Sequence, residues 1–198
     1  MKNITLTLSF VFLAVFANAQ VEKLAGPRIG VTFLSTGISA DIVNEGIDHW
    51  DDNDEIGNSG SAFVTQYGWQ WESRFADGHD VTGLVEWVVL VGGMEKGLFL
   101  PSVSSMVGAR TSSGLEFALG PNLSLSGIGM VFGAGFNFKA GDLNLPVNIA
   151  FTPSFKKTRD RDSSIYNPVT DEWEYTEWEE EFNTGSRFSI MIGFNLGR

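Results

Sequence analysis

Apolar residues occupy every second position along several stretches of this chain, and small or polar residues fill the places between them. One such stretch, from Gly129 to Phe155, holds two alternating runs separated by Ala140-Gly141-Asp142. Its apolar positions are Met130, Phe132, Ala134, Phe136, Phe138, Leu143, Leu145, Val147, Ile149 and Phe151. A period of two around a short glycine-containing turn predicts a β-hairpin with one apolar face.

The same period recurs along the chain and predicts eight strands, whereas the 3.6-residue period of helices is weak throughout. The expected strands span residues 29–33, 63–75, 81–91, 102–110, 115–120, 130–139, 143–152 and 188–196. The connections after the second, fourth and sixth strands are short and contain glycine, as tight hairpins require. Long connections, about residues 42–61 and 156–184, follow the first and the seventh strands. Short turns at one end and long loops at the other are the plan of a transmembrane barrel.

The chemistry of the two strand faces favours lipid on the outside. The less apolar face carries many glycines and few charges, which does not suit a surface in water. The large apolar residues expected to face lipid and its interfaces are Trp69, Trp71, Trp87, Phe132, Phe136, Phe138, Ile190 and Ile192. The sparse charges expected in the interior are Glu72, Arg74, Glu86, Arg110 and Glu116. Because an unpaired charge in a narrow, side-chain-filled interior is costly, at least one Glu–Arg contact should form there.

Only a closed barrel lets strands cross lipid with every backbone group paired. The sequence therefore predicts an all-β fold, an eight-stranded antiparallel up-and-down transmembrane β-barrel. The alternative is a soluble, lipocalin-like barrel that holds its apolar face inside and binds an apolar ligand. Proline lacks a ladder donor, so the prolines should lie near rims or at bulges: Pro101, Pro121, Pro146 and Pro153.

The first residues have the pattern of a secretory signal peptide. Lys2 precedes an apolar core, Ile4 to Phe16, that is shorter than the roughly 20 residues of a spanning helix. Ala17-Asn18-Ala19 forms a small-residue cleavage site. We therefore expect residues 1–19 to be removed and residues 20–198 to form one barrel domain. The chain has no cysteine, which excludes a lipid-anchored lipoprotein, disulfides and thiolate metal sites.

The chain is acidic, with a formal net charge of −11, which argues against nucleic acid as a partner. The first acidic cluster, Asp48 to Glu55, resembles a calcium loop. It is not an EF-hand, because Ile56 and Phe63 stand where an EF-hand needs ligands. Its candidate ligands for a loose divalent cation that bridges lipopolysaccharide phosphates are Asp51, Asp52, Asp54 and Glu55. His49 and His79 lie in predicted connections with no recognisable hydrolase arrangement around them. We expect no catalytic residue, no cofactor and no enzymatic activity.

A second acidic cluster, residues 171–181, alternates acids with aromatic residues. This pattern predicts that the strands continue beyond the membrane as a hairpin. The basic residues expected to oppose the acids are Lys156, Lys157, Arg159 and Arg161. The aromatic residues expected in the surface loops are Trp50, Trp173, Tyr175 and Trp178. Such residues support the hairpin, stack on sugars or contact a partner.

Three segments resemble small outer-membrane β-barrel proteins of the Bacteroidota kind. They are PRIGV (27–31), GLEFALGPNLS (114–124) and LPVNIAF (145–151). The resemblance implies a porin-like barrel in the outer membrane of a Gram-negative cell, with no enzymatic activity. Barrels of this kind often end on an aromatic residue that the assembly machinery reads. This chain ends FNLGR instead, so Phe194 would take that role.

The expected function is that of an outer-membrane barrel with a structural, adhesive or surface-interaction role and a filled interior. The alternatives are a narrow pore or a transport or secretion accessory, a lipid-modifying enzyme, and a periplasmic lipid binder. The expected partners are outer-membrane lipid and lipopolysaccharide, with divalent cations at the acidic loops. Because the number of strands is even, both chain ends should lie on the periplasmic side and the long loops outside.

Overall fold

The computed structural model describes residues 23–46, 59–141, 143–169 and 171–196 of the chain. The predicted signal peptide, residues 1–19, lies outside the described residues. So do His49, Trp50 and the candidate cation ligands Asp51, Asp52, Asp54 and Glu55.

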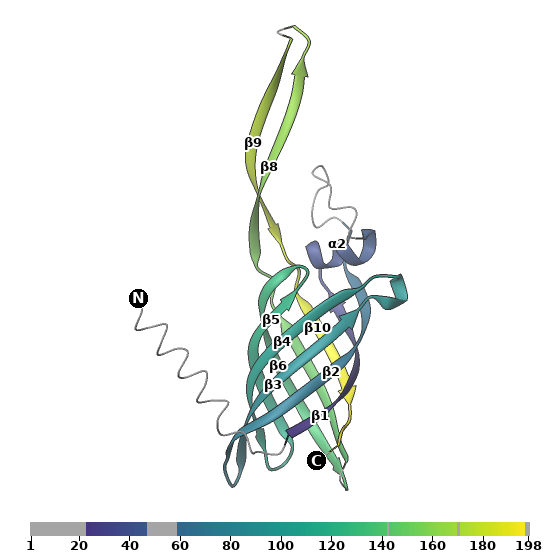
Figure 1. Ribbon diagram of the computed structural model, residues 1–198, viewed down its shortest axis with the longest axis vertical. Coiled ribbons are helices and arrows are strands. Elements are labelled where there is room, and N and C mark those ends of the chain that lie inside the picture. The colour runs from purple at the N-terminus through teal and green to yellow at the C-terminus, as the bar shows by residue number, and fades with distance from the viewer. Residues whose placement is uncertain (1–22, 47–58, 142, 170, 197–198) are drawn as a thin grey trace, which may run out of the picture.

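Eight antiparallel strands close into an up-and-down barrel, which confirms the predicted all-β, eight-stranded barrel architecture (Figure 1). They are β1 (Lys23–Leu34), β2 (Ala62–Asp77), β3 (Val81–Gly92), β4 (Leu100–Thr111), β5 (Leu115–Ser124), β6 (Gly127–Ala140), β7 (Leu143–Thr152) and β10 (Arg187–Gly193), which continues as β11 (Asn195–Leu196). Each barrel strand pairs with the next along the chain, and β10 pairs back onto β1. Several observed strands are longer than the strands expected from the sequence. The alternation of apolar and polar residues is weaker near the turns, so it did not mark these strand ends.

The second long connection forms the predicted hairpin, built from β8 (Lys156–Asn167) and β9 (Glu172–Asn183). It projects away from one end of the barrel, at the same end as the helix α2 (Ile38–Glu45) (Figure 1). The start of β1 and the end of β11 lie at the opposite end. The two long connections therefore share one end of the barrel, and the short turns share the other.

The helix α2 was not predicted, because the sequence indicated only a loop after the first strand. An eight-residue helix is too short to display a helical period, and such helices form through tertiary packing. Here Ala40 and Val43 pack against Leu34, Ala62 and Val64 at the end of the barrel. The helix thus covers the long-loop end with an apolar cluster. A short 3₁₀ turn, η2 (Met94–Lys96), lies in the connection from β3 to β4.

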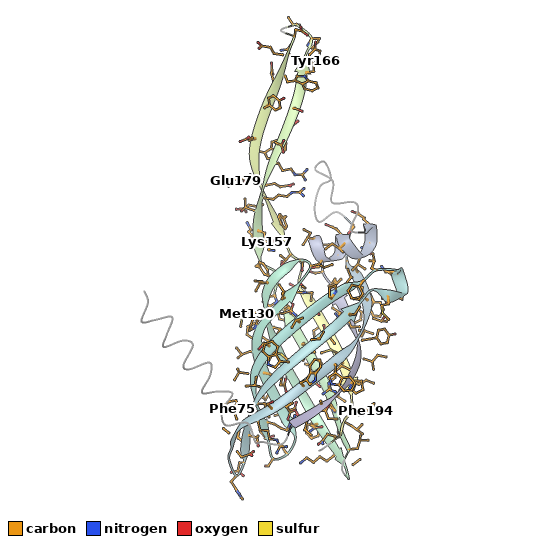
Figure 2. The ribbon with its side chains drawn as sticks, viewed as in Figure 1. Phe75, Met130, Lys157, Tyr166, Glu179 and Phe194 are labelled. Atoms are coloured by element: carbon orange, nitrogen blue, oxygen red, sulfur yellow. The ribbon has the colours of Figure 1, made fainter. Side chains whose placement is uncertain are left out.

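Side chains alternate between the inside and the outside of the barrel. Along β2, Trp69 and Trp71 are exposed, whereas Gln70 and Glu72 are buried. A second apolar cluster fills the middle of the interior, and it consists of Val88, Leu90, Met106, Val131 and Met191. Figure 2 shows the side chains that project from the outer surface, among them the labelled Met130. The interior is therefore filled with both polar and apolar groups.

The prolines within strands lie where the ladder is interrupted. Pro121 lies within β5, not at a rim, and pairing of β4 with β5 stops between Ser104–Asn122 and Val107–Leu119. Pro146 lies beside the break between β10 and β11. Pro101 is the second residue of β4, and Pro153 follows β7. The expectation of rim or bulge positions was therefore wrong for Pro121 and Pro146: the missing proline donor is accommodated by a local gap in pairing.

Candidate functional site

The barrel interior holds a buried ion-pair cluster centred on Arg110. The Arg110 Nη1 atom donates to one carboxylate oxygen of Glu72 at 2.7 Å, and its Nη2 donates to the other. Its Nε donates to Glu116, the residue directly opposite on the neighbouring strand. All three side chains are buried. A guanidinium that binds two carboxylates through charge-assisted hydrogen bonds offsets the cost of burying these charges.

Arg28 is a further interior charge that sequence reasoning missed. Its Nε donates to Gln70 Oε1 at 2.9 Å, and its Nη1 donates to the carbonyl oxygen of Pro27 at 2.9 Å. The prediction began the first strand at Ile29, six residues after its observed start at Lys23. Extending the alternation by one place puts Arg28 on the inward face with Gly30 and Thr32, so the signal was present in the sequence.

The remaining predicted interior charges are Glu86 and Arg74. Glu86 is 3% exposed, and within the described part of the chain no hydrogen bond or ion pair reaches its carboxylate. Arg74 is half-buried and lies opposite Leu84, next to a bulge between Arg74 and Ala76. The structure thus places all five predicted charges on the inward face and joins three of them directly.

The described residues line at least two small cavities inside the barrel. One, of about 70 Å³, has Glu86, Glu116, Asn122 and Asn148 in its lining. The other, of about 60 Å³, lies beneath α2. Each has room for a few water molecules only, well below the roughly 300 Å³ or more of a typical ligand pocket. Neither cavity could hold a lipid-sized ligand.

The outer surface of the barrel is apolar. The eight residues predicted to face lipid have exposed fractions between 37% and 53%: Trp69, Trp71, Trp87, Phe132, Phe136, Phe138, Ile190 and Ile192. Neighbouring outward positions are apolar as well, including Ile29, Leu119 and Ile149. The soluble alternative required this face to point inwards, which is wrong for this chain. Large exposed apolar surfaces of this kind mark membrane or protein contact sites.

Ion pairs hold the base of the β8–β9 hairpin together. Lys156 binds Glu181 at 2.8 Å, and Arg159 and Arg161 bind the same Glu180 oxygen at 3.0 and 2.6 Å. The hydrogen bond from Arg161, supported by Arg159, lowers the pKa of the Glu180 carboxyl below its ordinary value. The predicted pairing of basic residues with acids across the hairpin is thus confirmed at these three positions.

The base of the hairpin is also tied to the barrel. Lys157 Nζ donates to the carbonyl oxygen of Ser126 at 2.7 Å and lies 5.7 Å from the centre of the Phe155 ring. The three described loop aromatics are all exposed on β9: Trp173, Tyr175 and Trp178. His79 is exposed in the turn after β2.

Among the described residues, no group of three or more His, Asp or Glu side chains is placed to hold a metal ion. No helix in this part of the chain is long and apolar enough to cross a membrane. A scan of protein-family models, a search of curated proteins and a search of solved structures each gave no match to the chain.

Proposed function

We propose that this protein is an outer-membrane β-barrel with a structural, adhesive or surface-interaction role. The observation that carries the proposal is the apolar belt around the barrel, which includes Trp69, Phe132 and Ile190 on three different strands. In water such a surface would aggregate, whereas in lipid it is the favoured outer face of a barrel. The partners of this surface are the lipids of the membrane.

The filled interior supports a structural or surface-interaction role over the role of an ion-conducting pore. The apolar cluster around Val88, Met106 and Val131 occupies the middle of the interior, and α2 covers one end. Ions do not cross an apolar constriction readily, so a narrow pore has less support than a filled barrel. We propose no catalytic role, and no arrangement of side chains among the described residues favours the alternative of a lipid-modifying enzyme.

The elements at the long-loop end support a role at the cell surface. The hairpin β8–β9 and the helix α2 both lie there, where the acidic loops would meet lipopolysaccharide and its divalent cations (Figure 1). The resemblance to small outer-membrane barrels of the Bacteroidota kind agrees with this orientation. Phe194, exposed beside the break in the last strand, is the aromatic residue we propose for recognition by the assembly machinery.

Cell fractionation combined with heat-modifiable gel mobility tests the proposal. Expressed from its full gene in a Gram-negative host, the protein should appear in the outer-membrane fraction. It should migrate differently before and after boiling, because closed barrels resist detergent unfolding. A protein found in the periplasmic fraction, with one mobility at all temperatures, would contradict the proposal.

A further inference from the structure

The β8–β9 hairpin has two chemically different faces, because successive residues of a strand point to opposite sides. One face carries the ion pairs of Glu180 with Arg159 and Arg161. The other, which we term the aromatic–acidic face, comprises Tyr166, Trp173, Tyr175, Asp160, Asp162, Glu177 and Glu179. Figure 2 labels Tyr166 near the tip, Glu179 midway and Lys157 at the base.

Three aromatic side chains lie uncovered on the aromatic–acidic face. Tyr166 and Trp173 are paired across the hairpin, with ring centres 5.4 Å apart and a tilt of 54°. Tyr166, Trp173 and Tyr175 are 44%, 57% and 73% exposed. Large exposed Trp and Tyr side chains of this kind are typical of contact surfaces, where they dominate binding energy.

The charges beside these aromatics are not compensated. Asp160 lies directly opposite Glu179, and Asp162 lies directly opposite Glu177. Like charges in directly opposite positions destabilise a strand pair. Among the described residues, none of these four carboxylates forms a hydrogen bond or an ion pair. Both arginines of β8 point to the other face, and Lys156, which lies on this face, binds Glu181 instead. The two like-charge pairs are therefore left without a cationic partner among the described residues.

Above its base, the hairpin has no strand neighbour. In the described structure, β8 and β9 pair only with each other, so both edges of this two-stranded sheet are unpaired. A two-stranded ribbon is marginally stable in water unless a further layer packs against it. A partner on the aromatic–acidic face would supply that layer.

We propose that the aromatic–acidic face binds a basic polypeptide segment. Lysine or arginine side chains of the partner would lie between the two like-charge pairs, and their cations would also contact the rings of Trp173 and Tyr175. The proposal rests on the proposed function, because it requires the hairpin to stand outside the membrane. The aromatic–acidic face would be the surface that carries the surface-interaction role, and a basic polypeptide would be its partner.

Fluorescence anisotropy with the full chain in detergent micelles tests the proposal. The probe is a labelled twelve-residue peptide in which lysine alternates with threonine. The variant E177Q/E179Q removes two charges from the aromatic–acidic face, and its matched control E172Q/E174Q removes two charges from the opposite face of β9. We expect the first to weaken peptide binding at least tenfold and the second less than threefold. Trp173 lies on the aromatic–acidic face and Trp178 on the opposite face. Trp173→Ala should therefore weaken peptide binding at least tenfold, and Trp178→Ala less than threefold.

Several results would overturn the proposal. Equal losses in E177Q/E179Q and E172Q/E174Q would mean that only net charge attracts the peptide. Absence of peptide binding, together with calcium binding that E177Q/E179Q abolishes, would assign the face to a cation instead. Heat-modifiable mobility of every variant reports on the barrel separately. A protein that shows no heat-modifiable mobility and is absent from the outer-membrane fraction contradicts the proposed function. An intact barrel that does not bind the peptide contradicts only the present proposal.

Discussion

Arg110 and Glu72 lie 38 positions apart in the sequence and form a two-point ion pair inside the barrel. The pair joins β4 to β2 across the intervening strand β3, and Glu116 on β5 completes it. Three strands are thereby linked through one guanidinium, in addition to their backbone ladders.

Removing Arg110 should destabilise the barrel strongly. Arg110→Met leaves the Glu72 and Glu116 carboxylates buried without their shared partner, which should cost about 3–5 kcal/mol. Urea unfolding of the protein in lipid vesicles measures this loss. The triple variant R110M/E72Q/E116Q, which removes the stranded charges, should recover at least half of it. A single variant within about 1 kcal/mol of wild type would show that the cluster contributes little.

Outward substitutions should show the depth dependence of a membrane. Phe132 lies near the middle of β6 and Ile128 near its start at the long-loop end, and both are exposed. Phe132→Arg should destabilise the inserted form by about 2–4 kcal/mol, whereas Ile128→Arg should cost only about 0–1 kcal/mol. Unfolding in vesicles compares the two variants. Equal costs at both depths would count against a lipid environment for this face.

Closure between the first and last strands should depend on Gly26. A Cβ atom at this position would lie 1.7 Å from the carbonyl oxygen of Phe194, so the backbone would have to move. Gly26→Ala should therefore destabilise the barrel by about 1–3 kcal/mol. Gly133→Ala is the control, because the nearest atom to its Cβ would be 3.6 Å away. Comparable heat-modifiable mobility and unfolding midpoints in both variants would contradict the close approach.

The carboxyl of Glu180 should titrate at low pH. Its pKa lies below the unfolded value of about 4.3, because the folded hairpin supplies Arg161 and Arg159 as partners. The ion pair therefore contributes stability above about pH 4.3 and loses it as the pH falls through the lowered pKa. Carbon-13 NMR of the carboxyl should give a midpoint below 4.3, and Arg161→Gln should move it upwards. A wild-type midpoint at or above 4.3 would show that the pair does not form.

The alternation of apolar residues was sufficient to predict the barrel, because each strand such as β6 obeys a local period of two. The same rule placed Glu72, Glu86 and Arg110 on one face. It could not show that Arg110 would bind Glu72 in preference to Glu86, since that choice depends on side-chain reach across several strands. The helix α2 escaped prediction for a related reason: its stability comes from contacts with β1 and β2, not from its own sequence.

Labelling of single cysteines in intact cells tests the central claim most directly, because the chain has no cysteine of its own. Ser164→Cys on the hairpin should react with a membrane-impermeant maleimide in intact cells. His79→Cys, in a short turn at the other end, should react only after the outer membrane is permeabilised. Phe132→Cys should stay unlabelled in both conditions because lipid covers it. If His79→Cys reacts in intact cells while Ser164→Cys does not, the orientation is wrong; if all three react equally once the membrane is permeabilised, the barrel does not lie in that membrane.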